Sequence, residues 1–342
     1  MGTQKVKLNK KGQQVLLVAG TVFVMLIIIV AAAVKSNNRE VEETTTESSY
    51  VAVWTSMPEG TAPFEAKTAA AGVFNDIYSE KAVLIHLDSG EVLAEKNAYD
   101  RGQPASITKV MTTIIAIENI PDLDATYTMP IEIFNEIYGQ DLSSAGLVNG
   151  ETLTIRDILY GLFLRSGAEC CLAIENIVSG DSESFVALMN AKAEELGLND
   201  THFANSTGDT DENHYTTVYD MAILLRYCLQ NETFREIAST SEYTVAPTNK
   251  HADGLTFNST LSQSLPIMSD YEGLFTIEGG KTGHTDTAGR CLITFAEING
   301  EEYILCTFGA YNFDGQPTTN LHTRDHCNVY SAFSKSILGI ED

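Results

Sequence analysis

The sequence predicts an α+β fold: one antiparallel sheet built from N-terminal and C-terminal strands, flanked by helices and accompanied by a helical subdomain. Two hairpin patterns support this fold class. Apolar residues within 82–95 are interrupted by an Asp-Ser-Gly turn, and apolar residues within 292–308 are interrupted by Asn299-Gly300, a pair typical of two-residue hairpin turns. Between the hairpins the apolar residues follow helical spacing, so the sheet is expected to join both ends of the chain.

Helical spacing is clearest around residues 155–163, where apolar side chains recur at every third or fourth position. That is the spacing of a helix with one buried stripe. Gly197 follows another helical segment at the position where a left-handed glycine commonly ends a helix. Further helices are expected over residues 182–196, 217–229 and 324–337.

The first part of the chain differs in composition from the rest. Residues 15–34 carry no charge, are long enough to cross a bilayer as one helix, and are preceded by four lysines. A cleaved signal peptide ending near Ala31-Ala32-Ala33 is the alternative, and the body would then be secreted. We favour a protein held at the cell membrane by a single span, with a cytoplasmic basic tail over residues 1–14, a transmembrane signal anchor over 15–34, a flexible extracytoplasmic linker over 35–71 and an extracytoplasmic folded domain over 72–342.

Charge and cysteine spacing exclude several classes of protein. The formal net charge is −25, and the N-terminal lysines make the remainder still more acidic. Such a body is repelled by phosphate backbones, so nucleic acid is excluded as a partner, and any bound anion needs positive charge supplied locally. The six cysteines form no Cys-x-x-Cys pair, which excludes a zinc ribbon and a thioredoxin-like motif. Most of them lie in apolar runs, where buried free thiols are expected, although disulfide pairing stays open.

Three short motifs carry residues suited to nucleophilic catalysis: Ser106-Ile107-Thr108-Lys109, Ser166-Gly167-Ala168 and Lys281-Thr282-Gly283. Pro104 and the apolar run after Lys109 place Ser106 in the first turn of a buried helix. Residues three apart share a helix face, so the Lys109 amine is expected within reach of the Ser106 hydroxyl. A serine beside a base is the arrangement of an activated nucleophile.

Lys109 can act as a base only if its pKa falls far below the free value of about 10.4. Burial penalises the ammonium form, and a neighbouring cation penalises it further. Lys281 is the expected neighbour. Glycines before and after Lys281 leave the backbone of its strand open to close approach by a ligand.

From residue 82 to the C-terminus the sequence resembles the serine-type D-alanyl-D-alanine carboxypeptidases, which are low-molecular-mass penicillin-binding proteins. The resemblance rests on five segments in order: PASITKVMT, GLFLRSGAE, NAKAEELGLNDTHFANSTG, HYTTVYDMAILLRY and GGKTGHTDTAGRCL. It implies a β-lactamase/transpeptidase-like fold. It also implies removal of the terminal D-alanine from peptidoglycan stem peptides through an acyl-enzyme. We expect a single catalytic domain over 72–342, because a hairpin and a helix account for the residues after Lys281.

The resemblance also implies the catalytic residues. Ser106 attacks the carbonyl of the penultimate D-alanine, Lys109 takes the proton of Ser106, and Ser166 relays a proton to the departing amine. Water then hydrolyses the acyl-enzyme. A peptidoglycan pentapeptide is the expected substrate, β-lactams are expected inhibitors, and neither a metal nor a cofactor is expected.

Substrate binding is assigned by the same resemblance to residues 281–284. Lys281 holds the terminal carboxylate with help from Thr282, while Gly283 belongs to the same binding strand. The backbone N–H groups of Ser106 and His284 form the oxyanion hole, which is worth on the order of 3 kcal/mol of barrier per donor.

Ala168 departs from the family pattern. The second motif is commonly Ser-x-Asn, and alanine cannot hydrogen bond to a substrate amide or to the catalytic lysine. Losing one such bond costs about 0.5–1.5 kcal/mol, so reduced or altered activity is expected.

Two other functions stay open. A serine β-lactamase of the same fold shares the first and third motifs, but no Glu-x-x-Leu-Asn segment follows Ser166 to activate the deacylating water. A catalytically weak muropeptide-binding protein is suggested by Ala168, although Ser106, Lys109 and Lys281 are all retained.

The histidines give weaker signals. His322 and His326 are four residues apart, but they lack the glutamate of a His-Glu-x-x-His site, so both are expected in solvent rather than on a metal. His214 matches a family position near the site, and we expect it to be a structural, hydrogen-bonded histidine.

Overall fold

The computed structural model describes residues 64–266, 271, 273–311 and 320–340. They belong to one compact unit that spans residues 59–342. The predicted basic tail, the predicted membrane anchor and most of the predicted linker lie outside the described residues. Among those described, no helix combines the length and the hydropathy needed to cross a bilayer.

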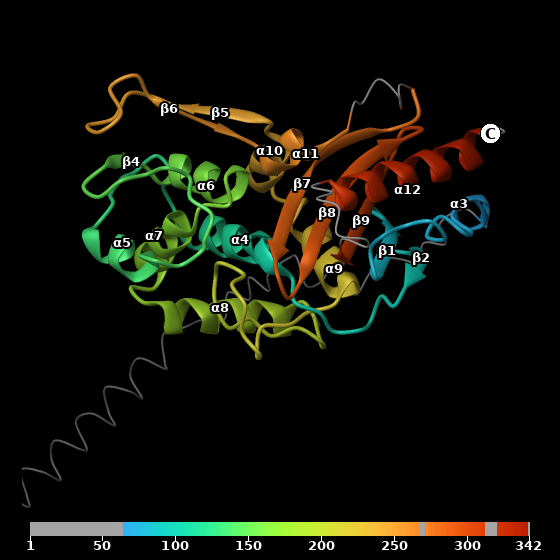
Figure 1. Ribbon diagram of the computed structural model, residues 1–342, viewed down its shortest axis with the longest axis horizontal. Helices are drawn as coiled ribbons and strands as arrows, with labels where there is room; N and C mark the ends of the chain where they lie inside the picture. The colour runs from blue at the N-terminus through green and yellow to red at the C-terminus, as the bar shows by residue number, and fades with distance from the viewer. Residues whose placement is uncertain (1–63, 267–270, 272, 312–319, 341–342) are drawn as a thin grey trace, which may run out of the picture. The chain divides into compact units, whose positions relative to one another are not determined.

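The described residues form a five-stranded antiparallel sheet with the strand order β2-β1-β9-β8-β7 (Figure 1). Leu84 on the first strand pairs with Leu305 near the end of the chain, which confirms that N-terminal and C-terminal strands share one sheet. Asn299 and Gly300 have φ values of 55° and 84°, as the predicted hairpin turn requires. The strands are β1 (Lys81–His86), β2 (Val92–Lys96), β7 (Thr276–Thr285), β8 (Gly289–Ile298) and β9 (Glu301–Ala310).

Helices cover both faces of this sheet (Figure 1). Successive strand residues point to opposite faces. Leu84 packs in the cluster that contains α12 (Leu321–Leu338), whereas Val83 packs in the cluster that contains α9 (Val218–Cys228). The two clusters bury the middle of β1, β8 and β9 on both sides, which explains why these strands read as continuous apolar runs.

A helical subdomain lies beside the sheet (Figure 1). A Thr154–Asp157 capping box starts α6 (Ile155–Leu164). Gly197, just after α8 (Ser182–Glu195), has φ 69°, the left-handed conformation that was predicted for it. The predicted helices are confirmed as α6, α8, α9 and α12. The elements of the subdomain are a 3₁₀ turn η1 (Ala105–Thr108), α4 (Lys109–Asn119), α5 (Ile131–Ile137), α6 (Ile155–Leu164), α7 (Ala168–Val178), α8 (Ser182–Glu195), α10 (Glu232–Ser239), α11 (Thr260–Ser264), and the paired strands β3 (Thr126–Thr128) with β4 (Thr152–Thr154) and β5 (Glu242–Val245) with β6 (Leu255–Asn258).

The folded domain begins earlier than the sequence predicted. Residues 64–71 were assigned to the linker, but Phe64–Ala69 form helix α3. Ala66, Ala69 and Ala70 are buried in the same cluster as α12. Alanines at this spacing make a narrow apolar stripe, which the surrounding threonines and charges concealed.

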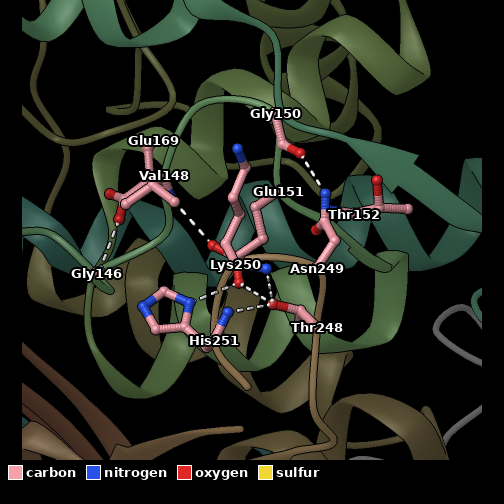
Figure 2. A network of polar contacts seen from close by, with 10 residues as sticks. All are labelled: Gly146, Val148, Gly150, Glu151, Thr152, Glu169, Thr248, Asn249, Lys250 and His251. Atoms are coloured by element: carbon pink, nitrogen blue, oxygen red, sulfur yellow. Dashed lines mark hydrogen bonds and ion pairs between the residues drawn. The ribbon is translucent and has the colours of Figure 1, made fainter. Parts of the chain in front are cut away.

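A polar network ties the loop before β4 to the loop between β5 and β6 (Figure 2). The fully buried carboxylate of Glu151 accepts hydrogen bonds from Val148 N at 3.0 Å and Thr248 Oγ1 at 2.8 Å. His251 Nδ1 lies 2.7 Å from the same carboxylate. A buried carboxylate is stable only with such partners, so the network fixes both loops against the subdomain.

Candidate active site

Ser106 lies in the 3₁₀ turn η1, immediately before α4 rather than inside it. A 3₁₀ turn has three residues per turn, so side chains three apart still lie on one side. Lys109 Nζ is 3.0 Å from Ser106 Oγ, within hydrogen-bonding distance. The pair therefore has the geometry that was predicted from the spacing of the two residues.

The Lys109 amine is buried, with 2% of the residue exposed. It also donates to the backbone carbonyl of Thr207 at 2.5 Å. Burial lowers the pKa of Lys109, while the nearby thiols of Cys171 and Cys170 and the carboxyl groups of Glu169 and Asp209 act in the opposite direction. The net lowering of the pKa makes the neutral amine easier to populate, and that form can accept the proton of Ser106.

Lys281, on β7, pairs with the serine of the second motif. Its Nζ donates to Ser166 Oγ at 3.2 Å and to the carbonyl of Thr282 at 2.9 Å. Burial holds the pKa of Lys281 well below its ordinary value, and the positive charge of Lys109 lowers it further. The repulsion between the two amines that we expected from the sequence is therefore present in the site.

Ser166 and Ala168 differ in what they offer the site. Ser166 follows α6 with φ 62°, a left-handed conformation that costs a non-glycine residue about 1–2 kcal/mol. Ala168 begins α7, is buried, and donates its backbone N–H to the carbonyl of Ser143 at 2.8 Å. Strained residues cluster at functional sites, which fits the contact of Ser166 with Lys281. The effect of Ala168 on activity stays a prediction.

A cavity of about 670 Å³ opens over these residues. Ser106, Ser166, Thr282, Gly283 and His284 line it, whereas Lys109 and Lys281 do not reach its surface. The cavity runs along β7, which is the edge strand of the sheet, so an extended ligand can pair with free backbone groups there. The predicted site residues thus converge on one cavity, with the two amines behind its serines.

Gly283 allows β7 to approach the turn that carries Ser106. A Cβ atom on this residue would lie 2.9 Å from the carbonyl oxygen of Pro104 and 3.1 Å from the backbone nitrogen of Ser106. Only a glycine fits this approach without displacement of the turn. The backbone of residues 283–284 therefore lies beside Ser106, where the second oxyanion donor was expected.

Sequence reasoning missed the loop that supports Lys109. The contact of Thr207 with Lys109 uses a backbone carbonyl, so the side chain gave no signal. Asn205 Oδ1 accepts from the backbone N–H groups of Gly208 and Asp209, at 2.7 and 3.1 Å, and shapes the loop. The sequence hint was the Asn-x-x-Gly pattern, because asparagine commonly hydrogen bonds to backbone shortly after it.

We expect Gly208→Ala to disrupt the nucleophile turn. Gly208 has φ 82°, and an added Cβ would lie 1.9 Å from the carbonyl oxygen of Ala105. The rate of covalent labelling by a fluorescent penicillin should fall at least tenfold as Ser106 is displaced. The matched control is Gly180→Ala, where φ is 86° but nothing lies within 4 Å of the added atom. Equal labelling rates in the two variants would contradict this account.

Glu169 is a second residue that sequence reasoning missed. Its Oε1 accepts from Ser144 Oγ at 2.7 Å and from the N–H groups of Ala145 and Gly146 at 2.8 and 3.0 Å. The contact with Gly146 appears in Figure 2. The loop held in this way continues into residues 141–143, which form a wall of the cavity. A glutamate beside the second motif gave no sign of this positioning contact.

The prediction that His322 and His326 lie in solvent was wrong. They are 3% and 0% exposed. His326 bonds through both ring nitrogens, to Thr294 Oγ1 at 2.8 Å and to Thr307 Oγ1 at 3.0 Å. The start of α12 packs on the sheet, a tertiary contact that four-residue spacing alone does not show. No cluster of metal-ligating side chains occurs within the described ranges.

His214 is buried and hydrogen bonded, as expected. Its Nε2 lies 2.8 Å from Thr108 Oγ1, and its Nδ1 accepts from the backbone N–H of Ala204 at 3.1 Å. It thereby ties the nucleophile turn to the loop that supports Lys109. Burial lowers the pKa of His214 to about 4.

This pKa predicts a loss of stability in acid. As the pH falls, His214 binds a proton in the unfolded chain near pH 6.5 but in the folded chain only near pH 4. Its contribution to the free energy of unfolding is therefore complete above about pH 6.5 and is lost progressively toward pH 4. The loss is on the order of 3 kcal/mol. Urea unfolding of His214→Gln should show a correspondingly smaller decrease in free energy of unfolding between pH 7 and pH 4.5. The same decrease in both proteins would exclude His214 as the cause.

The comparisons with known proteins agree with the geometry. Residues 65–312 match the family model described as D-alanyl-D-alanine carboxypeptidase. The chain is 34% identical over 233 residues to the D-alanyl-D-alanine carboxypeptidase DacF of Bacillus subtilis, covering 68% of this chain and 57% of the relative. It is 29% identical over 256 residues to DacA of Escherichia coli, covering 73% and 60%. The chain thus spans about three fifths of the length of these curated relatives.

A solved structure supports the same fold. The Streptomyces K15 DD-transpeptidase superposes with a TM-score of 0.67 at 26% identity, covering 75% of this chain and 97% of that one. The α+β fold with its antiparallel sheet is therefore shared with a DD-peptidase. From the extent of the family match, the chain belongs to the D-alanyl-D-alanine carboxypeptidase family.

Proposed function

We propose that the protein is a serine D-alanyl-D-alanine carboxypeptidase that removes the terminal D-alanine of peptidoglycan stem peptides. The observation that carries the proposal is the contact of Ser106 Oγ with the buried amine of Lys109 at the floor of an open cavity. The relatives named above are D-alanyl-D-alanine carboxypeptidases, which supports this choice of substrate.

In the proposed acylation step, neutral Lys109 takes the proton of Ser106 as Oγ attacks the carbonyl of the penultimate D-alanine. The developing oxyanion is stabilised by the backbone N–H groups of Ser106 and His284. Ser166, bonded to Lys281, passes a proton to the departing D-alanine amine. Lys109 gives the proton that it took from Ser106 to Ser166, so that Lys109 is neutral again and Ser166 regains its hydrogen. In deacylation, Lys109 takes a proton from the water that attacks the ester and delivers it to Ser106 Oγ as the ester bond breaks, which releases the shortened peptide.

The substrate in this proposal lies along β7. Its backbone pairs with the free edge of the strand near Thr282, and its end lies toward the start of α12. Lys281 contacts Ser166 from behind the surface of the cavity. Arg290 lines the cavity and supplies local positive charge, which offsets the acidic character of the chain toward an anionic peptide.

The test is D-alanine release by the purified protein from a pentapeptide that ends in D-Ala-D-Ala, with a peptide that ends in D-Ala-L-Ala as control. Release from the first peptide only is expected, together with a slowly hydrolysed penicilloyl-enzyme. Rapid turnover of penicillin without D-alanine release would identify a β-lactamase. If the protein shows neither D-alanine release nor penicillin turnover, a muropeptide-binding protein is the remaining function.

We also propose that residues 15–34 anchor the protein in the cell membrane with its catalytic domain outside. The uncharged run and the preceding lysines support this topology, and peptidoglycan lies on that side of the membrane. Membrane fractionation should find the full chain in the membrane and a chain lacking residues 1–35 in the soluble fraction. Full-length chain in the soluble fraction would contradict the anchor.

A further inference from the structure

His322 has an environment unlike that of the other buried histidines in the described part of the chain. His214 and His326 use both ring nitrogens in hydrogen bonds. His322 is 3% exposed, and its Nδ1 is closed off from solvent without any hydrogen-bond partner. Buried polar atoms nearly always have partners, so an unpaired imidazole calls for an explanation.

The imidazole of His322 lines the same cavity as Ser106 and Thr282. Only Nδ1 is both closed off and unpaired, which leaves Nε2 as the ring nitrogen open to the cavity. A ring N–H at the sealed Nδ1 would be a buried donor without an acceptor. The neutral ring therefore carries its hydrogen on Nε2, where it can donate to a bound ligand.

Basic side chains lie near His322, and Asp141, Asp209 and Asp286 line the same cavity. Arg290, on β8, lines the cavity and makes no ion pair with the described residues. His284, on β7, lines it as well. Burial, together with the charge of Arg290 and His284, lowers the pKa of His322 to about 3, so the imidazole is neutral at physiological pH. A neutral donor beside an unpaired guanidinium is suited to an anionic group.

The Lys281 amine is engaged with other partners. Its amine donates to Ser166 Oγ and to the Thr282 carbonyl, and it does not reach the surface of the cavity. Arg290 on β8 and His322 on the first turn of α12 both line the cavity. These two side chains are therefore placed to meet an anionic group that enters the cavity.

We propose that His322 is a specificity residue, whose Nε2–H donates to the free C-terminal carboxylate of the peptide while Arg290 pairs with the same group. This inference rests on the proposed carboxypeptidase function and deepens it. His322 and Arg290 then define the outer end of the site and select peptides that stop one residue beyond the scissile bond. A peptide with an amidated end lacks the charge that both groups recognise.

The test compares two substitutions that place an amide differently. The side-chain amide nitrogen of glutamine reaches the position of the histidine Nε2, whereas that of asparagine reaches only the position of Nδ1. With a D-Ala-D-Ala pentapeptide, H322Q should keep KM within about threefold of wild type, and H322N should raise KM about tenfold with little change in kcat, as for one lost charge-assisted hydrogen bond. The preference for the free acid over the C-terminal amide should fall by the same factor in H322N.

A structural role for His322 would give a different pattern. The two variants would then change kcat and the melting temperature alike, with the acid-to-amide preference unchanged, and the proposal would be overturned. Wild-type D-alanine release separates this failure from the failure of the proposed function. If the wild type releases D-alanine and H322N keeps its preference, only the assignment of His322 fails. If the wild type releases none, both fail.

Discussion

Replacing Ser106 with alanine is expected to abolish D-alanine release and covalent labelling by penicillin. Ser106 is the only hydroxyl that contacts the Lys109 amine among the described residues. Without it no acyl-enzyme forms, and residual hydrolysis should fall by on the order of 10⁴- to 10⁶-fold, as for other enzymes that lose their nucleophile. The measurements are D-alanine release and the rate of penicilloyl-enzyme formation.

The matched control is Ser143→Ala. Ser143 lines the same cavity but makes no side-chain hydrogen bond with the described residues. This variant should keep most of the activity and should melt close to wild type. If Ser143→Ala lost as much activity as Ser106→Ala, or if Ser106→Ala kept its penicillin label, another residue would have to be the nucleophile.

Lys109→Met is expected to slow acylation by about 10²- to 10⁴-fold, the usual contribution of a general base. Methionine is unbranched and suits the buried position, so the fold should be retained. Lys67→Met is the control, because Lys67 has 60% of its side chain exposed on α3. A Lys109→Met protein that is acylated at the wild-type rate would exclude Lys109 as the base.

The pH dependence of acylation gives an independent test of Lys109. A base must be unprotonated, and burial lowers the pKa of Lys109 below the ordinary 10.5. The wild-type acylation rate should therefore increase with pH as the Lys109 amine loses its proton, with a midpoint below pH 10.5. This rising limb should be absent in Lys109→Met, as measured by stopped-flow acylation over the same pH range.

Much of the fold could be predicted because its signals are local. The Asn299-Gly300 turn and the apolar runs beside it define the hairpin of β8 and β9. The Ser106–Lys109 contact likewise depends on a spacing of three residues within one turn. In both cases the residues that interact are close in sequence, so short patterns carry the information.

The parts that could not be predicted depend on contacts between distant segments. The Ser166–Lys281 contact joins the end of α6 to β7, and the support of Lys109 comes from the backbone of Thr207. The burial of His322 depends on how α12 packs against the sheet. Helix α3 was missed because its apolar stripe consists of alanines, whose burial depends on the surface they meet.

The most direct test is mass spectrometry of the protein after reaction with benzylpenicillin, followed by peptide mapping of the adduct. The account predicts one penicilloyl group per chain, attached to the peptide that contains Ser106 and absent from the Ser106→Ala protein. An adduct on another residue, or no adduct on a folded protein, would contradict the role of the Ser106–Lys109 pair.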